Sequence, residues 1–199
     1  MHSIHHNQTE ENRANLADYD AVERIREVVA KTQTCFLCTS SDAGPSSGVR
    51  PMSVQAVGDD GTLWFLSASD SRKNADVKEW PKVNLYFQGT EHSDFLHLTA
   101  AATISTERKR IAELWKPILK TWFTEGVNDP RITVLKVVPE SGYYWDNKHG
   151  NLVAGAKMLI GAAIGKTMDD SIEGRLDFQT ASKSGAWPFS ALPRARSAT

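Results

Sequence analysis

The chain has 199 residues, of which 40% are hydrophobic and 24% are charged, the proportions of an ordinary globular protein. This composition excludes a disordered chain, a collagen and a coiled coil, and the length suits one domain with its own core. The 23 lysines and arginines nearly balance the 24 acidic residues, so the net charge is -1, whereas a general nucleic-acid binder usually carries a basic excess.

The sequence carries no recognisable targeting or membrane signal. Residues 1–15 are polar and lack the apolar stretch of a signal peptide, and no apolar run approaches the ~20 residues of a membrane span. Two cysteines are too few for a disulfide framework. We therefore expect a cytoplasmic protein that binds neither membrane nor nucleic acid.

The predicted elements begin after a flexible N-terminal arm at residues 1–17. A helix follows, which Asp18 or Asp20 could cap, because apolar residues then recur at helical spacing. A short helix is expected within 69–80, and 107–123 reads as a helix that Pro117 kinks or ends. Six strands are predicted, at residues 32–40, 50–57, 62–68, 82–88, 95–105 and 132–145, the last with a break at Pro139.

Short turns join most of these strands, as in the Gly58–Gly61 hairpin signal, which is not the βαβ rhythm of a parallel sheet. The pattern predicts a mainly β fold, a six-stranded antiparallel split β-barrel with helices packed at its ends. We assign residues 18–147 to this domain. Residues 148–199 are expected to be a partly disordered C-terminal extension, with a mobile Ser/Ala/Pro/Arg-rich end.

Two motifs resemble functional sites, but the position of one and the spacing of the other argue against those functions. Cys35 and Cys38 have the C-x-x-C spacing of redox and zinc sites. They fall inside a predicted strand, where such residues point to opposite faces roughly 10 Å apart, so they are expected to pack instead. Residues 161–167 resemble a phosphate-binding loop but have three residues between the glycines, where that motif has four.

A small histidine cluster also falls short of a metal site. His92, Asp94 and His97 lie close together in sequence, but a third or fourth ligand is not evident beside them. We interpret them as solvated polar residues, and we predict no metal site.

The segment with the clearest chemistry is 65–73, in which a strand runs directly into a helix. Ser71, Arg72 and Lys73 fall at the helix start, where free backbone N–H groups favour an anion. The hydroxyl and two cations would add charge-assisted hydrogen bonds, and Arg50 could reach the same anion from a neighbouring strand. These residues predict a phosphate site, although a solvated, capped helix start has the same sequence signals.

With these motifs in view, the sequence resembles the pyridoxamine 5'-phosphate oxidase-like, FMN-binding split-barrel superfamily, and within it the bacterial general-stress-protein branch. The resemblance runs from Ala21 to Asp146. Its most specific pieces are the strand beginning at Arg50, the strand-to-helix turn at 65–73 and the segment 81–87. The stress-protein branch in particular is suggested by Trp115, Trp122, Phe123, Gly126, Asp129, Pro130 and the run Tyr144, Trp145 and Asp146.

The resemblance implies FMN as the cofactor and assigns roles by position. The positions that match the FMN phosphate site are Arg50, Ser71, Arg72 and Lys73. Those that match the strand along the isoalloxazine are Pro51, Met52 and Ser53, and those at the ring edge and ribityl chain are Leu66 and Ser67. In such barrels the flavin lies at a homodimer interface, and Trp115 or Trp145 could be a contact there. We count Trp145 among the expected cofactor-binding residues.

Two departures from the oxidases bear on activity. The Lys that reaches substrate in the oxidases is replaced by Gln55, and Trp145 is followed by 146–149 rather than by the Arg and His pattern that grips the vitamin phosphate. The expectation is therefore an FMN-binding stress-response protein with flavin redox activity that is not a true pyridoxamine 5'-phosphate oxidase. The alternatives are a non-catalytic flavin-binding or sensing protein, and a split-barrel reductase that uses a deazaflavin or haem.

Overall fold

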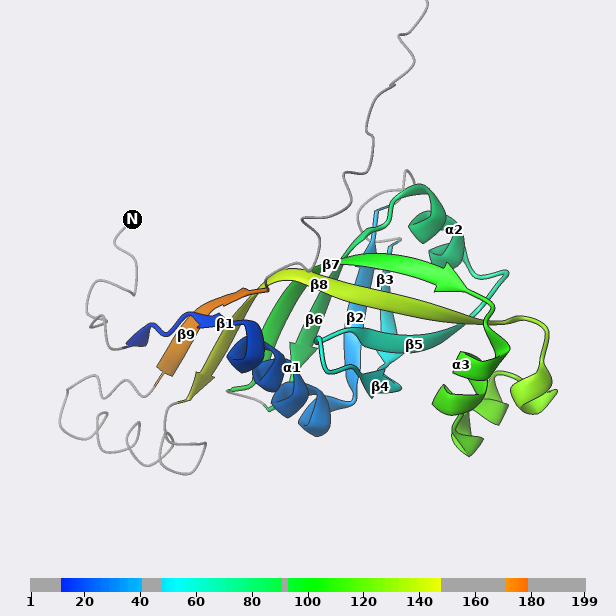
Figure 1. The fold of residues 1–199 in the computed structure, drawn as a ribbon, viewed down its shortest axis with the longest axis horizontal. Helices are drawn as coiled ribbons and strands as arrows, with labels where there is room; N and C mark the ends of the chain where they lie inside the picture. Colours follow the sequence, from blue (N-terminus) through cyan, green and yellow to red (C-terminus); the bar gives the residue numbers. More distant parts are fainter. Residues whose placement is uncertain (1–11, 41–47, 91–92, 148–170, 179–199) are drawn as a thin grey trace, which may run out of the picture.

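The computed structural model describes residues 12–40, 48–90, 93–147 and 171–178 (Figure 1). The helices are α1 (Asp18–Thr32), α2 (Arg72–Glu79) and α3 (Arg108–Leu114), with 3-10 turns η3 (Pro117–Thr121) and η4 (Gly126–Asn128). The strands are β1 (Leu16–Ala17), β2 (Thr34–Thr39), β3 (Val49–Ser53), β4 (Ala56–Val57), β5 (Leu63–Ala68), β6 (Lys82–Gln88), β7 (Phe95–Ser105), β8 (Ile132–Asn147) and β9 (Ser171–Asp177).

The strands form one nine-stranded sheet with the order β1-β9-β8-β7-β6-β2-β3, and β5 pairs with β8 and with β4. Every pairing is antiparallel except that of β1 with β9. Within these described strands β3 and β5 do not pair with each other, so the sheet is not closed. The opening between β3 and β5 is called the seam below.

This architecture confirms the predicted mainly β split-barrel fold. The six predicted strands correspond to β2, β3 with β4, β5, β6, β7 and β8. The sequence did not predict β1 and β9: β9, from the expected extension, pairs with the edge of β8, and β1, from the expected arm, pairs with β9. Arg13 binds Glu173 there, and a side chain at Gly174 would collide with the carbonyl group of Ala14, so a glycine is required at that crossing.

Local signals explain where several elements begin and end. The turn between β4 and β5 uses Gly61 at a φ of +79°, and Asp60 Oδ1 accepts the backbone N–H of Thr62 at 3.0 Å. Pro117 follows the end of α3 and opens η3, as expected of a residue without a backbone N–H. Strand β8 nevertheless continues through Pro139. Ala100 pairs with Pro139 and Thr99 with Ser141, so Glu140 is left out of the pairing as a β-bulge.

The predicted capping of the first helix by Asp18 or Asp20 was wrong. Helix α1 has Ala17 at its N-cap, and no side chain caps it, while both aspartates lie in the first turn. Carboxylates there still interact favourably with the helix dipole, which is why acidic residues suit this position. None of the described helices is both long enough and apolar enough to cross a bilayer.

Two apolar cores lie on the two faces of β5 and β8. The main core fills the barrel, with Leu63 and Phe65 of β5 contacting residues of α1 and the other strands. The second core lies outside it, where Leu66 packs against α3 and the segment after it. Alternation along β5 therefore aims successive side chains into different cores, and the part of its edge beyond the β4 pairing faces the seam.

Candidate functional site

A cavity of about 500 Å³ opens at the seam and gathers most of the predicted cofactor residues; we call it the seam pocket. Strand β3 supplies one wall and the end of β5 the opposite wall, while the start of β2, the β3–β4 link, α2, and η3 with the segment after it supply the rest. Its lining comprises Thr34, Pro51, Met52, Ser53, Gln55, Leu66, Ser67, Ala68, Lys73, Leu119, Trp122 and Phe123. Residues from distant parts of the chain thus meet because β3 and β5 stay unpaired.

Lys73 is the cation of the seam pocket. It lies in the first turn of α2, and its side chain is partly buried. Burial lowers the pKa of the Lys73 ammonium, the charge of Arg50 lowers it further, and Asp70 opposes both effects. The desolvated ammonium and its cationic neighbour make this place favourable for an anion.

Arg50 does not line the cavity itself, but it lies close enough to act on Lys73. Its guanidinium donates to Thr39 Oγ1 at 3.3 Å and to Asp76 Oδ2 at 3.3 Å. Thr39 Oγ1 donates in turn to Asp76 Oδ2 at 2.7 Å. These contacts tie β2, β3 and α2 together beside Lys73, so Arg50 is held by a carboxylate that sequence reasoning did not find.

Ser67 and Ser71 belong to a buried polar network. Ser67 Oγ donates to Asn74 Oδ1 at 2.7 Å, and Asn74 Nδ2 donates to Thr133 Oγ1 at 2.9 Å. Thr133 Oγ1 donates back to the carbonyl oxygen of Ser67 at 2.9 Å, and the hydroxyls of Ser67 and Ser71 lie 3.2 Å apart. Because its proton is engaged by Asn74, Ser67 offers the cavity an acceptor, and the network fixes the turn from β5 into α2.

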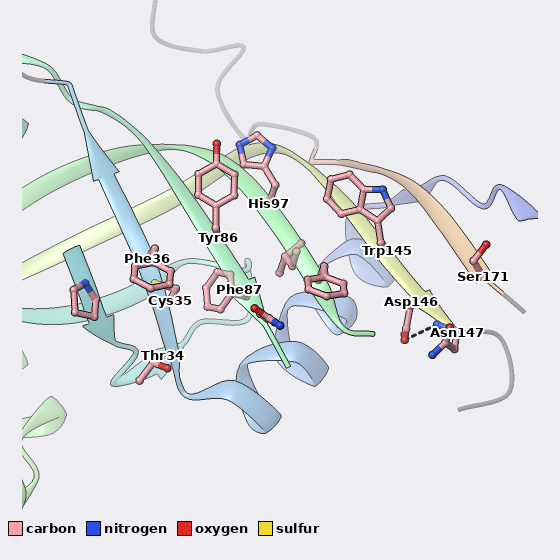
Figure 2. Close-up of a pocket in the computed structure, with 14 residues that line it drawn as sticks. Thr34, Cys35, Phe36, Tyr86, Phe87, His97, Trp145, Asp146, Asn147 and Ser171 are labelled. Atoms are coloured by element: carbon pink, nitrogen blue, oxygen red, sulfur yellow. Dashed lines mark hydrogen bonds between the residues drawn. The ribbon is translucent and has the colours of Figure 1, made fainter. Parts of the chain in front are cut away.

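The remaining predicted residues lie apart from this set. Arg72 is exposed at the first position of α2, beside Lys73 in sequence. Trp145 lies on β8 and lines a second cavity, of about 810 Å³, on the outer face of the sheet (Figure 2). The structure therefore does not bring Trp145 together with Lys73 within one chain, while Pro51 lines both cavities.

This second cavity, the outer-face pocket, is rich in aromatic side chains. Phe36 is the cross-strand neighbour of both Pro51 and Tyr86, and Tyr86 is the neighbour of His97. The Tyr86 and His97 rings stack with centroids 4.7 Å apart, and Figure 2 shows them side by side above the strands. The exposed fractions of Phe36, Tyr86 and Trp145 are 56%, 48% and 43%. A row of exposed aromatic groups across one sheet face is typical of a surface that another molecule covers.

Sequence reasoning missed the apolar wall and the amide of the seam pocket. Leu119 and Phe123 belong to the second core, and Trp122 lies on the rim with 63% of its surface exposed. The sequence identifies Gln55 only as a departure from the oxidases and not as a site residue. The paired aromatic residues after Pro117 were a usable signal, but their facing β3 depends on the fold.

The structure confirms the expectation for the cysteine pair but not the one for Asp94. Cys35 is buried on the inner face of β2 and Cys38 is partly exposed on the other face, so both are free thiols, as predicted. Burial raises the pKa of Cys35 to about 12. Asp94 was expected to be solvated, and that was wrong: it is buried, and Lys31 Nζ lies 2.6 Å from its Oδ1.

The histidine cluster gains no metal-site character from the structure. His97 is partly buried, its Nε2 lies 3.0 Å from Asn84 Oδ1, and burial lowers its pKa. Among the described residues, no three His, Cys, Asp or Glu side chains come together as metal ligands would. His92 and residues 161–167 lie outside the described residues.

The unclosed antiparallel barrel with a cation-lined cavity at its seam defines a mainly β protein of split-barrel type. The sequence matches the family described as "Pyridoxamine 5'-phosphate oxidase like" over residues 20–169. The chain belongs to that family, as the resemblance indicated. It is also 28% identical over 90 residues to protein bli-3 of Neurospora crassa, a match that covers 41% of this chain and 43% of bli-3.

Solved structures share the fold at low sequence identity. A candidate general stress protein 26 from Jannaschia sp. CCS1 superposes with a TM-score of 0.67 at 21% identity, over 80% of this chain and 99% of its own. The general stress protein 26 of Bacillus anthracis gives 0.55 at 22% identity, over 62% and 92%. The general stress FMN/FAD binding protein of Xanthomonas citri gives 0.51 at 23% identity, over 60% and 84%. At these identities the likeness concerns the fold.

Proposed function

We propose that this protein binds FMN in the seam pocket, with the FMN phosphate at the start of α2. The observation that carries the proposal is the position of Lys73, a partly buried cation at a helix start that faces a cavity between two unpaired strands. Arg50, whose charge lowers the pKa of Lys73, adds a second positive charge, and the Ser71 hydroxyl lies 3.2 Å from that of Ser67 beside them. A phosphate satisfies such a group of donors well.

The rest of the seam pocket fits a planar ring. Pro51, Met52 and Ser53 form one wall along β3, and Trp122 and Phe123 provide an aromatic wall. Predominantly apolar lining with few polar groups is typical of cofactor sites. Bound FMN would supply the capacity to take up and release electrons, and the protein would supply binding, orientation and polarity.

We infer that the redox partner is not pyridoxamine 5'-phosphate. In the oxidases that this chain resembles, a lysine stands where Gln55 stands, and an Arg and His pattern follows the last Trp. Here Asp146 follows Trp145 and forms a 2.6 Å ion pair with Arg24. A carboxylate that is already paired with Arg24 offers no donor to grip a substrate phosphate.

We further propose that the protein is a cytoplasmic homodimer that pairs through the outer face of its sheet. The support is the aromatic row formed by Phe36, Tyr86 and Trp145, which a single chain leaves exposed. In such a dimer the outer-face pocket of one chain would face its partner, and Trp145 would contact the partner's flavin rather than its own.

The test is a visible spectrum of the purified protein followed by FMN titration, monitored by flavin fluorescence. Lys73→Ala is expected to weaken FMN binding by roughly five- to one-hundredfold, because a charge-assisted hydrogen bond is lost. Lys78→Ala is the matched control, since Lys78 lies on the same helix with an exposed side chain. A colourless protein that does not bind FMN contradicts the proposal, and a haem or deazaflavin spectrum would identify the other cofactors.

A binding role without turnover is the second candidate. Of the described residues that line the seam pocket, Lys73 alone titrates, so the cavity wall offers a cation but no carboxylate or imidazole for proton transfer. Reduction of the FMN-loaded protein by a nicotinamide, followed over several turnovers, separates an oxidoreductase from a flavin-binding or sensing protein.

A further inference from the structure

Gln55 occupies the point where the chain crosses the seam from β3 to β4. Its backbone N–H donates to the carbonyl oxygen of Trp64 at 2.8 Å, which fastens it to β5. Its side-chain Nε2 donates to the carbonyl oxygen of Ser53 at 3.0 Å. Both bonds fix the residue in place, and Gln55 is one of the residues that line the seam pocket.

The other end of the Gln55 amide has no partner. Oε1 is shielded from solvent and accepts no hydrogen bond from the described residues. The orientation of the amide is determined, because a flipped amide would set Oε1 against the Ser53 carbonyl oxygen, and two acceptors repel each other. A buried acceptor without a donor is costly and uncommon in folded proteins.

We propose that Gln55 Oε1 accepts a hydrogen bond from a ring N–H of the bound ligand, so that Gln55 selects a heterocycle with a donor at its edge. This inference rests on the proposed flavin function and deepens it. A flavin offers such a donor at the imide nitrogen, and, when reduced, a second one at N5.

The two possible donors predict different binding behaviour. If the imide donates, N3-methyl-FMN binds the wild-type protein more weakly than FMN does, by roughly five- to tenfold, the loss expected for one hydrogen bond. If N5 donates, reduced FMN binds more tightly than oxidised FMN by a similar factor, and the midpoint potential of bound FMN rises. Both measurements use the unaltered chain and do not depend on how a variant folds.

Gln55→Met then tests the residue, because methionine is similar in length and has no strong acceptor. It should reduce the affinity for FMN, in the oxidised or the reduced state, by that factor, and abolish the difference between the paired ligands. Ser141→Met, at an exposed position of β8, is the control and should bind as the wild type does.

The outcomes separate this inference from the proposed function. Wild-type protein that binds no flavin overturns both. Wild-type protein that binds FMN, with equal affinity for N3-methyl-FMN and no preference between oxidation states, overturns only the role of Gln55. A Gln55→Met protein that binds FMN in both states as tightly as the wild type does the same.

Discussion

The Arg50 guanidinium lies 3.3 Å from Asp76 Oδ2, and this ion pair joins β3 to the helix that carries Lys73. Both side chains are largely buried, and the Thr39 hydroxyl donates to the same carboxylate oxygen. An arginine in this position has N–H groups beyond those used by Asp76 and Thr39. Asp76 therefore holds the cation in place without using all of its donors.

Asp76→Ala should weaken FMN binding by about three- to tenfold, because Arg50 loses the partner that positions it. Riboflavin, which lacks the phosphate, should bind the variant and the wild type equally. Asp76→Asn should be milder, since an amide oxygen still accepts from Thr39 and Arg50. Titration of each protein with both flavins provides the measurement.

The matched control is Asp94→Ala, which removes another buried carboxylate, one bound by Lys31 and the Ser93 hydroxyl. It should lower the thermal midpoint yet leave the ratio of FMN to riboflavin affinity unchanged. Tighter FMN binding by both Asp76 variants would mean that Asp76 competes with the phosphate instead of positioning Arg50.

The lowered pKa of Lys73 predicts a particular alkaline limit for FMN binding. Only the ammonium form attracts a phosphate, and its pKa lies below the ordinary 10.5. As the pH rises, FMN affinity should therefore fall earlier than an ordinary lysine would allow, and bound phosphate should raise the pKa of Lys73. Lys73→Arg should retain affinity to higher pH, because a guanidinium stays protonated.

Dissociation constants measured for wild type and Lys73→Arg across neutral to alkaline pH provide the test. Comparing the two proteins at each pH cancels any titration of FMN itself. Parallel curves would show that Lys73 does not carry the phosphate interaction.

The part of the site around α2 could be predicted from the sequence. The run from β5 into α2 carries its own signals, a strand pattern followed by polar residues at a helix start, so Ser67, Ser71 and Lys73 could be placed together. The hydrophobic alternation likewise predicts the strands that form the two sides of the seam. These features depend on residues close in sequence, which local patterns describe well.

Contacts between distant segments account for what the sequence did not predict. Asp76 reads as an ordinary helix residue until β2 and β3 bring Thr39 and Arg50 against it. Asp94 looks solvated because its partner, Lys31, is 63 positions away. Strand β9 contains charged residues and was missed, since Glu173 is buried only after Arg13 and β8 reach it. Such burial is decided by tertiary pairing rather than by local pattern.

Asp129 and Arg131 predict a pH dependence of stability. The Arg131 guanidinium donates to both carboxylate oxygens of Asp129 and holds the pKa of that carboxyl below its ordinary value of 3.8. A carboxyl with a lowered folded-state pKa stabilises the fold above its unfolded-state pKa, and this contribution disappears as the pH falls through the folded-state value.

Asp129→Asn should therefore unfold at a lower temperature than the wild type at neutral pH, and the difference should shrink below about pH 4. Thermal unfolding of both proteins across that range checks it. Asp59→Asn is the control, because Asp59 is fully exposed where it meets Arg26, so its removal should matter little. A difference between Asp129→Asn and wild type that is constant with pH would contradict the linkage.

The aromatic outer face predicts how the chains associate. A charge placed among Phe36, Tyr86 and Trp145 would have to be buried without a partner if a second chain covers this face, so Phe36→Glu should shift the dimer to monomers. Sedimentation velocity of wild type and variant at equal concentration measures this. Tyr19→Glu provides the control, because Tyr19 is 72% exposed on α1, away from this row.

If the flavin also contacts the partner chain, Phe36→Glu should weaken FMN binding in step with dissociation. A wild-type protein that sediments as a monomer, or a Phe36→Glu protein that remains dimeric, would place the interface elsewhere.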